Sequence, residues 1–144
     1  MSEPERHAPS PDLGFQIPRR AWPRRRLLNV WADDLSMDSL LQRLDAEGGL
    51  VFTINPDHLW HLQNSAAFTA AYRQADFITV DSQYVHAAMH WLGQGVGATI
   101  TGSDLMPAYC RRHAANPEVK IFLLGAKAGV AQRAGAGLDD DRGP

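Results

Sequence analysis

Apolar and polar positions divide the chain into short apolar runs separated by helix-patterned stretches. The apolar runs occupy residues 27–30, 50–54, 77–80 and 121–124. Apolar runs of this length are typical of buried strands. Between them, apolar side chains recur every three or four residues, as on one face of a helix. Strands that alternate with helices predict βαβ units, so we expect a Rossmann-like α/β fold with a parallel sheet flanked by helices.

The predicted helices begin at residues suited to cap them. Ser36 precedes a helix that ends at Gly48, and Asn55 precedes one whose first turn holds a proline. Ser103 is the predicted cap of a helix that runs to about residue 113. Further helices are predicted over residues 66–74, 84–92 and from 129 onward, the first of them as a continuation of the preceding helix or as a separate one.

The two ends of the chain differ in composition from the part between them. Residues 1–26 are rich in proline and arginine, so we expect a disordered N-terminal extension. Its Arg19–Arg26 cluster is either part of a solvated tail or a contact to anionic lipid. Residues 27–135 form the predicted α/β domain, and 136–144 form a predicted loose tail. A sheet that stops after 121–124 is incomplete at its C-terminal side, and its exposed edge favours a homo-oligomer.

Composition narrows the class of protein without indicating a reaction. The 144 residues are 44% hydrophobic and carry a formal net charge of −2, which fits one globular domain. Because there is no net basic field, nucleic acid is not an expected partner. The single cysteine, Cys110, excludes an internal disulfide. No run approaches the roughly 20 apolar residues of a membrane span, so we expect a cytoplasmic protein that can dock at the inner face of the cell membrane.

Polar residues that follow the predicted strands are the first candidates for chemistry. Thr53 and Asn55 lie at the end of one strand, and Asp81 directly follows the next. Because ligands of open parallel sheets bind at the carboxyl ends of strands, these side chains are expected to share one crevice. A carboxylate there can accept a proton from a reacting hydroxyl, and Asp81 can instead cap the next helix. Asn55 can hydrogen-bond a polar ligand, cap its helix, or do both.

Two glycine-containing turns are candidates for binding a phosphate or another polar ligand. Gly102, Ser103 and Asp104 open a predicted helix whose backbone N–H groups can bind an anion. The Asp104 carboxylate would repel a phosphate, so a ligand hydroxyl is an equally good partner, and a plain capped turn fits as well. Gly125 and Lys127 link the last predicted strand to a helix and either contact a nucleotide diphosphate or form an ordinary tight turn.

Two histidine pairs raise the question of a metal. His58 and His61 are three residues apart and His86 and His90 are four apart, so each pair shares a helix face, as zinc ligands do. The chain has no HExxH motif and no paired cysteine, and we therefore expect no metal site. The absence of a GxGxxG motif likewise argues against a nucleotide-dependent oxidoreductase on a similar fold.

Four segments carry a resemblance to a known family: TINPDHL (53–59), ADFITVDSQ (75–83), ITGSDLMPAYC (100–110) and IFLLGAKAGVAQRA (121–134). In this order and spacing they resemble the WecG/TagA/CpsF glycosyltransferases, glycosyltransferase family 26. The resemblance implies transfer of an N-acetylmannosamine-type or related sugar from a UDP-sugar to a polyprenyl-diphosphate-linked saccharide acceptor, in cell-surface polysaccharide or teichoic-acid synthesis. It also implies an inverting reaction without a metal or other cofactor.

The resemblance also implies roles for individual residues. Asp81 stands at the position of the presumed general base, and Thr53 and Asn55 stand at substrate-contacting positions. The expected substrate-binding residues are Thr53, Asn55, Gln83, Gly102, Ser103, Asp104, Gly125 and Lys127. Family members are longer, and a C-terminal segment helps to complete their site. A catalytically incomplete nucleotide-sugar-binding fragment is therefore the alternative function.

Overall fold

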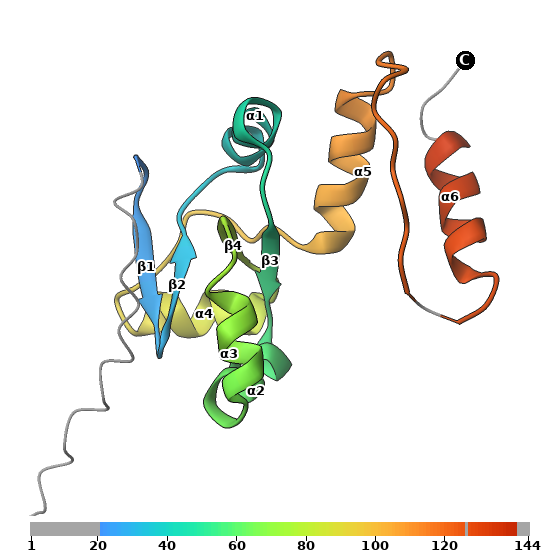
Figure 1. The fold of residues 1–144 in the computed structure, drawn as a ribbon. Coiled ribbons are helices and arrows are strands. Elements are labelled where there is room, and N and C mark those ends of the chain that lie inside the picture. The colour runs from blue at the N-terminus through green and yellow to red at the C-terminus, as the bar shows by residue number, and fades with distance from the viewer. Residues whose placement is uncertain (1–20, 126, 141–144) are drawn as a thin grey trace, which may run out of the picture.

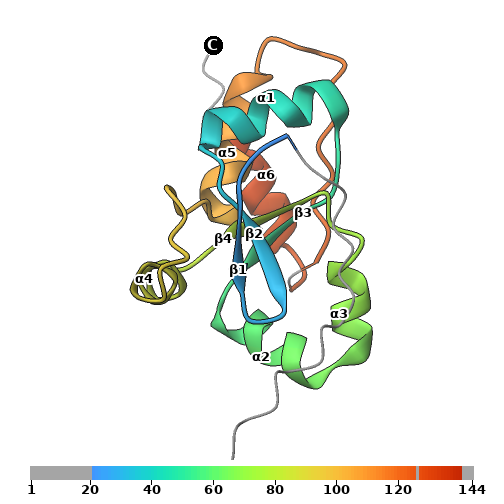
Figure 2. The ribbon, with the colours of Figure 1, turned by 90° about the vertical axis from the view of Figure 1, so that its left-hand side faces the viewer.

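The computed structural model describes residues 21–125 and 127–140, which form a mixed α/β fold (Figure 1). The elements are β1 Arg24–Leu27, β2 Val30–Asp33, α1 Met37–Glu47, β3 Val51–Ile54, α2 Pro56–Asn64, α3 Ala66–Tyr72, β4 Phe77–Val80, α4 Gln83–Trp91, α5 Gly102–Arg112 and α6 Val130–Asp140. Helix α1 lies beyond the amino end of β3, and α2 follows its carboxyl end (Figures 1 and 2). The predicted α/β class is therefore confirmed.

A two-stranded parallel sheet lies at the centre of the fold. β3 pairs with β4 in a register that sets Val51 opposite Phe77 and Ile54 opposite Val80. The predicted strands at residues 50–54 and 77–80 are thus confirmed, the first one residue shorter than expected. The caps predicted at Ser36 and Asn55 are also present, because their side-chain oxygens accept hydrogen bonds from backbone N–H groups three residues on.

The N-terminal part of the fold differs from the prediction. Residues 27–30 do not form a single strand: they hold the turn of an antiparallel hairpin between β1 and β2, where Leu28 has a φ of 53°. Arg24–Arg26, assigned to the extension, lie in β1. The apolar side chains that bury this hairpin, Leu27 and Val30, stand on either side of the turn, which made them look like one run. Residues 1–20 of the predicted extension lie outside the described residues.

A buried carboxylate holds the hairpin to the parallel sheet. Asp33, in β2, accepts a hydrogen bond of 2.6 Å from the backbone N–H of Ile78 in β4. It also accepts one of 2.8 Å from Trp22 Nε1, and its other partner is the Arg24 guanidinium. A buried charge is tolerated only when it is paired and hydrogen-bonded. Arg24 of the basic cluster therefore has a structural role inside the fold.

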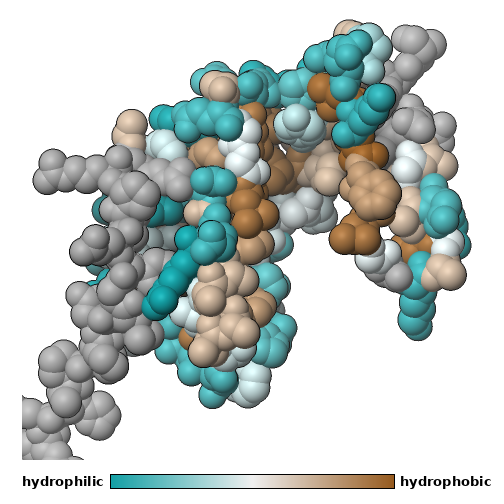
Figure 3. Space-filling model, viewed as in Figure 1, coloured by the Kyte–Doolittle hydropathy of each residue, from teal (hydrophilic) through white to brown (hydrophobic). Residues whose placement is uncertain are grey.

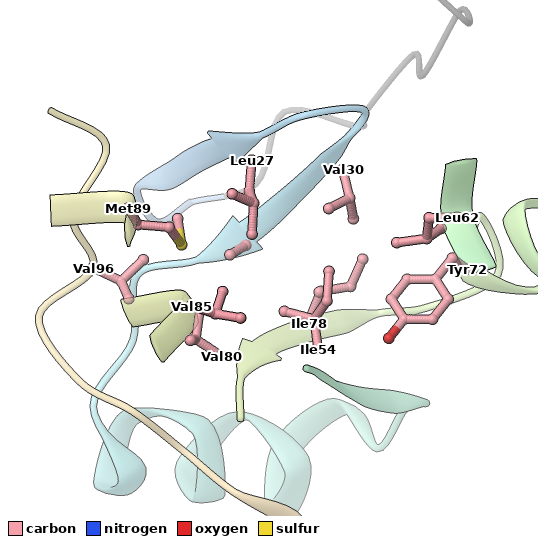
Figure 4. Packing of buried hydrophobic residues seen from close by; sticks show 11 residues of the cluster. Leu27, Val30, Ile54, Leu62, Tyr72, Ile78, Val80, Val85, Met89 and Val96 are labelled. Atoms are coloured by element: carbon pink, nitrogen blue, oxygen red, sulfur yellow. The ribbon is translucent and has the colours of Figure 1, made fainter. Parts of the chain in front are cut away.

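Apolar side chains pack on both faces of the parallel sheet. Ile54, Ile78 and Val80 belong to one buried cluster, and Figure 4 shows it between the hairpin and the parallel sheet, with helix α4 at one end. Phe77 faces the other way and packs in a second cluster with Leu40 of α1. Neighbouring strand residues point to opposite faces, so β4, with all four residues buried, is covered on both sides.

The C-terminal part of the described chain overturns two predictions. Residues 121–124 are not a strand, and they run beside α5 as an extended segment (Figures 1 and 2). An apolar run becomes a strand only when a neighbour completes its backbone hydrogen bonds, and this segment lies away from β3. Residues 136–140 are not a loose tail, because helix α6 extends to Asp140.

An ion-pair cluster joins the C-terminal parts of α1 and α5. Arg112 Nε donates to Asp45 Oδ2 at 2.6 Å, and His113 Nε2 lies 2.9 Å from Asp45 Oδ1. The hydrogen bond from Arg112 is the main reason why the pKa of the Asp45 carboxyl lies below its usual value of 3.8. This cluster holds the C-terminal end of α5. The N-terminal end of the same helix approaches the sheet.

The Asp45 cluster is expected to stabilise the fold at neutral pH and not in acid. A carboxyl whose pKa is lower in the folded than in the unfolded chain contributes stability above the unfolded pKa of 3.8. That contribution is lost as the pH falls through the folded pKa. Asp45→Asn should therefore lower the urea midpoint at about pH 6 and have a smaller effect at about pH 3. An equal effect at both pH values would contradict the prediction.

Candidate functional site

The carboxyl ends of β3 and β4 meet at one edge of the sheet. Ile54 and Val80 are register partners, and the backbone N–H of Asp81 donates to the Ile54 carbonyl at 2.8 Å. This bond carries the pairing one residue beyond the strands. As a result Asp81 lies beside the end of β3, where Thr53 and Asn55 are located. The predicted proximity of these strand ends is therefore present in the structure.

Asp81 does not cap the helix that follows it. The hydroxyl of Ser82 accepts from the backbone N–H groups of Tyr84 and Val85, at 3.2 and 3.3 Å, and caps α4. Asp81 Oδ2 instead faces the N-terminus of α5, where it accepts from the N–H of Gly102 at 3.4 Å. The capping role considered for Asp81 belongs to Ser82, and the half-buried carboxylate remains available at the edge of the sheet.

This division of roles makes a prediction about stability. Ser82→Ala removes the acceptor for two N–H groups of α4 and is expected to lower the free energy of unfolding by about 1 kcal/mol. Asp81→Ala should cost less, because its hydrogen bond to Gly102 is long. Urea denaturation followed by circular dichroism measures both. A larger cost for Asp81→Ala would show that its carboxylate has a structural role.

Thr53 and Gly102 bring β3 and α5 together. A side chain added at Gly102 would stand 3.8 Å from Thr53 Oγ1, so the threonine hydroxyl faces the start of the helix. Thr79, the register partner of Thr53, differs from it: it is buried and donates to the Ile100 carbonyl at 2.9 Å. Thr79 is therefore structural, whereas the half-buried Thr53 hydroxyl lies within the same group of side chains as Asp81.

Asn55 is committed to the fold through one atom of its side chain. Its Oδ1 accepts from the backbone N–H of His58 at 2.9 Å, which caps α2. Its amide nitrogen keeps two donors that can meet an acceptor such as a sugar hydroxyl. The cap role and the ligand role of Asn55 are therefore compatible.

The side chain of His58, in the same helix, has a structural contact. Its Nδ1 lies 2.6 Å from the hydroxyl of Tyr72, and burial raises the pKa of that phenol.

Thr101 caps the start of α5, so the predicted cap at Ser103 is wrong. Thr101 Oγ1 accepts from the N–H of Asp104 at 3.1 Å and donates to Asp104 Oδ2 at 2.8 Å. It also lies 2.8 Å from Ser103 Oγ. A threonine followed three residues later by an acidic residue is a signal for such a reciprocal cap, and it was present in the sequence. Ser103 and Asp104 are exposed beside Gly102, with their side chains turned to the cap.

The three remaining expected site residues are Gln83, Gly125 and Lys127. Gln83 is the first residue of α4 and is exposed next to Asp81. Gly125, with a φ of 111°, and the exposed Lys127 lie in the connection to α6. Figure 1 shows this connection apart from the ends of β3 and β4. The structure therefore gathers Thr53, Asn55, Asp81 and Gly102, and leaves Gly125 and Lys127 outside this group.

The two histidine pairs have protein partners. His61 Nε2 lies 3.6 Å from Asp57 Oδ2, and the Nε2 atoms of His86 and His90 lie 3.0 and 3.1 Å from one acceptor, the Val96 carbonyl. Within 21–125 and 127–140 there is no group of three or more histidine, cysteine or acidic side chains arranged to hold a metal ion. None of the helices in these ranges is long and apolar enough to cross a membrane.

The fold and the site together define a class of protein: an α/β chain with hydroxyl, amide and carboxylate side chains at the carboxyl ends of two parallel strands. Comparison with protein families then identifies it: the chain belongs to the Glycosyl transferase WecG/TagA/CpsF family, whose family model matches residues 25–142. A search of curated proteins gave no match. The resemblance drawn from the four sequence segments is confirmed, and the class of substrates is, in general terms, a nucleotide sugar and an acceptor.

Proposed function

We propose that the chain transfers an N-acetylmannosamine-type or related sugar from a UDP-sugar to a polyprenyl-diphosphate-linked saccharide acceptor. The reaction would serve cell-surface polysaccharide or teichoic-acid synthesis at the cytoplasmic face of the membrane. Membership of the family supports glycosyl transfer. The observation that carries the proposal is that Asp81 is free of the helix cap, which Ser82 provides, and lies beside Thr53 and Gly102.

Asp81 would act as the general base. In the proposed single displacement, an acceptor hydroxyl oxygen forms a bond to the anomeric carbon of the donor sugar. The bond from that carbon to the phosphate oxygen breaks on the opposite face, so UDP leaves and the configuration inverts. The hydroxyl proton passes to the Asp81 carboxylate as the new bond forms. No metal or other cofactor takes part in this scheme.

The neighbouring groups would hold the sugar and its leaving group. The Thr53 hydroxyl and the Asn55 amide match sugar hydroxyls, which both donate and accept hydrogen bonds. Gly102 allows a ligand to approach the first N–H groups of α5, which favour negative charge. The exposed side chains of Gln83, Ser103 and Asp104 flank this position and suit neutral sugar hydroxyls. Gly125 and Lys127 would meet the diphosphate only after a change of position.

A transfer assay tests the proposal. The folded chain is mixed with UDP-N-acetylmannosamine and a short-chain lipid-diphosphate-N-acetylglucosamine, and products are identified by mass spectrometry. A lipid-linked disaccharide supports the proposal. A folded chain that yields no disaccharide with this pair or with a panel of other UDP-sugars would overturn it.

The second candidate is a nucleotide-sugar-binding fragment without activity. It is favoured by one observation, the separation of Gly125 and Lys127 from the strand ends (Figure 1). Under this alternative, calorimetry would detect binding of UDP while the transfer assay stays blank. Asp81→Asn would then have little effect on binding, because there is no catalytic step for it to remove.

A further inference from the structure

Helix α5 buries little of its own surface, so specific hydrogen bonds must fix the position of its N-terminus. Of its 11 residues, which the structure describes in full, Cys110 alone is buried. In Figure 1 the helix lies between the strand-bearing part and the C-terminal segment, and Figure 3 shows the molecule hollowed between these two parts. The bonds of Arg112 and His113 to Asp45 hold its C-terminal end. The N-terminal end, which lies beside Asp81, needs an anchor of its own.

The hydrogen bond between Gly102 and Asp81 is too long to serve as that anchor. The backbone nitrogen of Gly102 lies 3.4 Å from Asp81 Oδ2, whereas typical N–H···O bonds measure about 2.9–3.0 Å. A bond of this length is weak and leaves the helix free to shift. The position of Gly102 beside Asp81 is therefore set by the chain just before the helix.

Ile100 is bonded to β4 through both of its backbone groups. Its N–H donates to the Val80 carbonyl at 2.9 Å, and its carbonyl accepts from the Thr79 hydroxyl at 2.9 Å. Because a peptide group is planar, the bond from Thr79 also fixes the direction of the N–H of Thr101, the cap of α5. The backbone torsions of Thr101 are then the one link between this anchored peptide group and Gly102.

Thr79 is a polar residue in an otherwise apolar strand. It stands between Ile78 and Val80, and 1% of its surface is exposed. A buried hydroxyl costs free energy unless it is hydrogen-bonded. Valine has a similar branched side chain and also favours strands, so it would fill the same space without that cost. The hydroxyl of Thr79 is thus explained by the bond that it makes to Ile100.

We propose that Thr79 is a positioning residue of the candidate site. Its hydroxyl fixes Ile100 and thereby holds Gly102 and the first N–H groups of α5 at a set distance from Asp81. Thr79 touches neither substrate in the proposed reaction, and it acts through the start of α5. Its effect on sugar transfer rests on the proposed function, whereas its anchoring of α5 does not.

The anchor matters for the reaction because two groups act across the space between β4 and α5. In the proposed reaction Asp81 takes the acceptor proton, and the N-terminus of α5 favours the charge on the leaving diphosphate. A displacement of about 1 Å can lower a rate by about 100-fold. Thr53 and Asn55 are placed by β3 and α2 and keep their positions. Loss of the Thr79 hydroxyl should therefore lower kcat and leave the KM for the UDP-sugar nearly unchanged.

Thr79→Val tests the anchor by removing the hydroxyl and keeping the shape of the side chain. We expect the kcat of sugar transfer to fall about tenfold or more. Thr79→Ser keeps a hydroxyl and should stay within a few-fold of the unsubstituted chain. The matched control is Thr69→Val: Thr69 is the other threonine that is buried in the described part of the chain, and its hydroxyl donates to the Leu62 carbonyl at 3.0 Å, between α3 and α2. This control should keep its rate at an equal concentration of folded protein.

Hydrogen exchange gives a readout that needs no activity. The amides of Ile100 and Leu105 both donate to backbone carbonyls, and they should exchange faster in Thr79→Val than in Thr69→Val. Faster exchange in a chain that transfers no sugar would support the anchor and overturn the proposed function alone. Unchanged exchange at both amides would overturn the proposal. In an active chain, an unchanged kcat in Thr79→Val, or an equal fall in Thr69→Val, would overturn it as well.

Discussion

Replacing Asp81 with asparagine is expected to lower the turnover of sugar transfer by roughly 100- to 10,000-fold, the range of a lost general base. Asparagine keeps the size of the side chain and its hydrogen-bond acceptor for Gly102, and it cannot take up the acceptor proton. The loss should therefore fall on kcat, with little change in the KM for the UDP-sugar. Initial rates over a range of donor concentrations measure both constants.

Asp57→Asn is the matched control for this variant. Asp57 is an exposed carboxylate in the first turn of α2, and its side chain lies 3.6 Å from His61. This control makes the same carboxylate-to-amide change in α2, the helix that follows β3, and leaves Asp81 and Gly102 unchanged. We expect a rate within a few-fold of the unsubstituted chain. Equal losses in both variants would assign the effect to general electrostatics or folding.

Replacing Asp33 with alanine is expected to lower the free energy of unfolding by about 3–5 kcal/mol, as for other broken buried ion pairs. The substitution leaves the largely buried Arg24 guanidinium without its carboxylate and the Ile78 N–H without its acceptor. Typical domains have only about 5–15 kcal/mol of stability, so the hairpin should separate from β4 or the chain should unfold. Urea denaturation followed by circular dichroism and tryptophan fluorescence measures the loss.

The control for Asp33 is a carboxylate in a surface ion pair. Glu47 lies 3.6 Å from Arg43 on the exposed part of α1, and such pairs contribute at most about 1 kcal/mol. Glu47→Ala should therefore leave the urea midpoint nearly unchanged. If Asp33→Ala is as mild as Glu47→Ala, the buried carboxylate does not hold the hairpin to the sheet.

The central elements could be predicted because their signals are local. Ser36 and Asn55 cap helices with a regular apolar face, and residues 77–80 form an apolar run of strand length. The meeting of Asn55 and Asp81 at one edge followed from the geometry of parallel strands. These features depend on neighbours in the sequence or on one general rule of topology, and the structure contains them.

The features that were missed depend on partners far along the chain. Asp33 accepts a hydrogen bond from Ile78, which is far from it in the sequence. No local pattern marks a buried carboxylate as the acceptor for a distant strand. Residues 121–124 have the pattern of a strand and lack a pairing neighbour in this structure. The cap at Thr101 is a different case, because its reciprocal partner Asp104 is close in the sequence, and the pattern of Thr101 and Asp104 is a local signal for this cap.

The most direct test of the central claim compares product formation by the unsubstituted chain and by Asp81→Asn at equal concentrations of folded protein. Lipid-linked disaccharide is quantified by mass spectrometry after incubation with the UDP-sugar and the lipid-diphosphate acceptor. The claim that the carboxyl edge of β3 and β4 performs the transfer predicts product from the unsubstituted chain and at least about 100-fold less from Asp81→Asn. Equal amounts of product from the two proteins would contradict it.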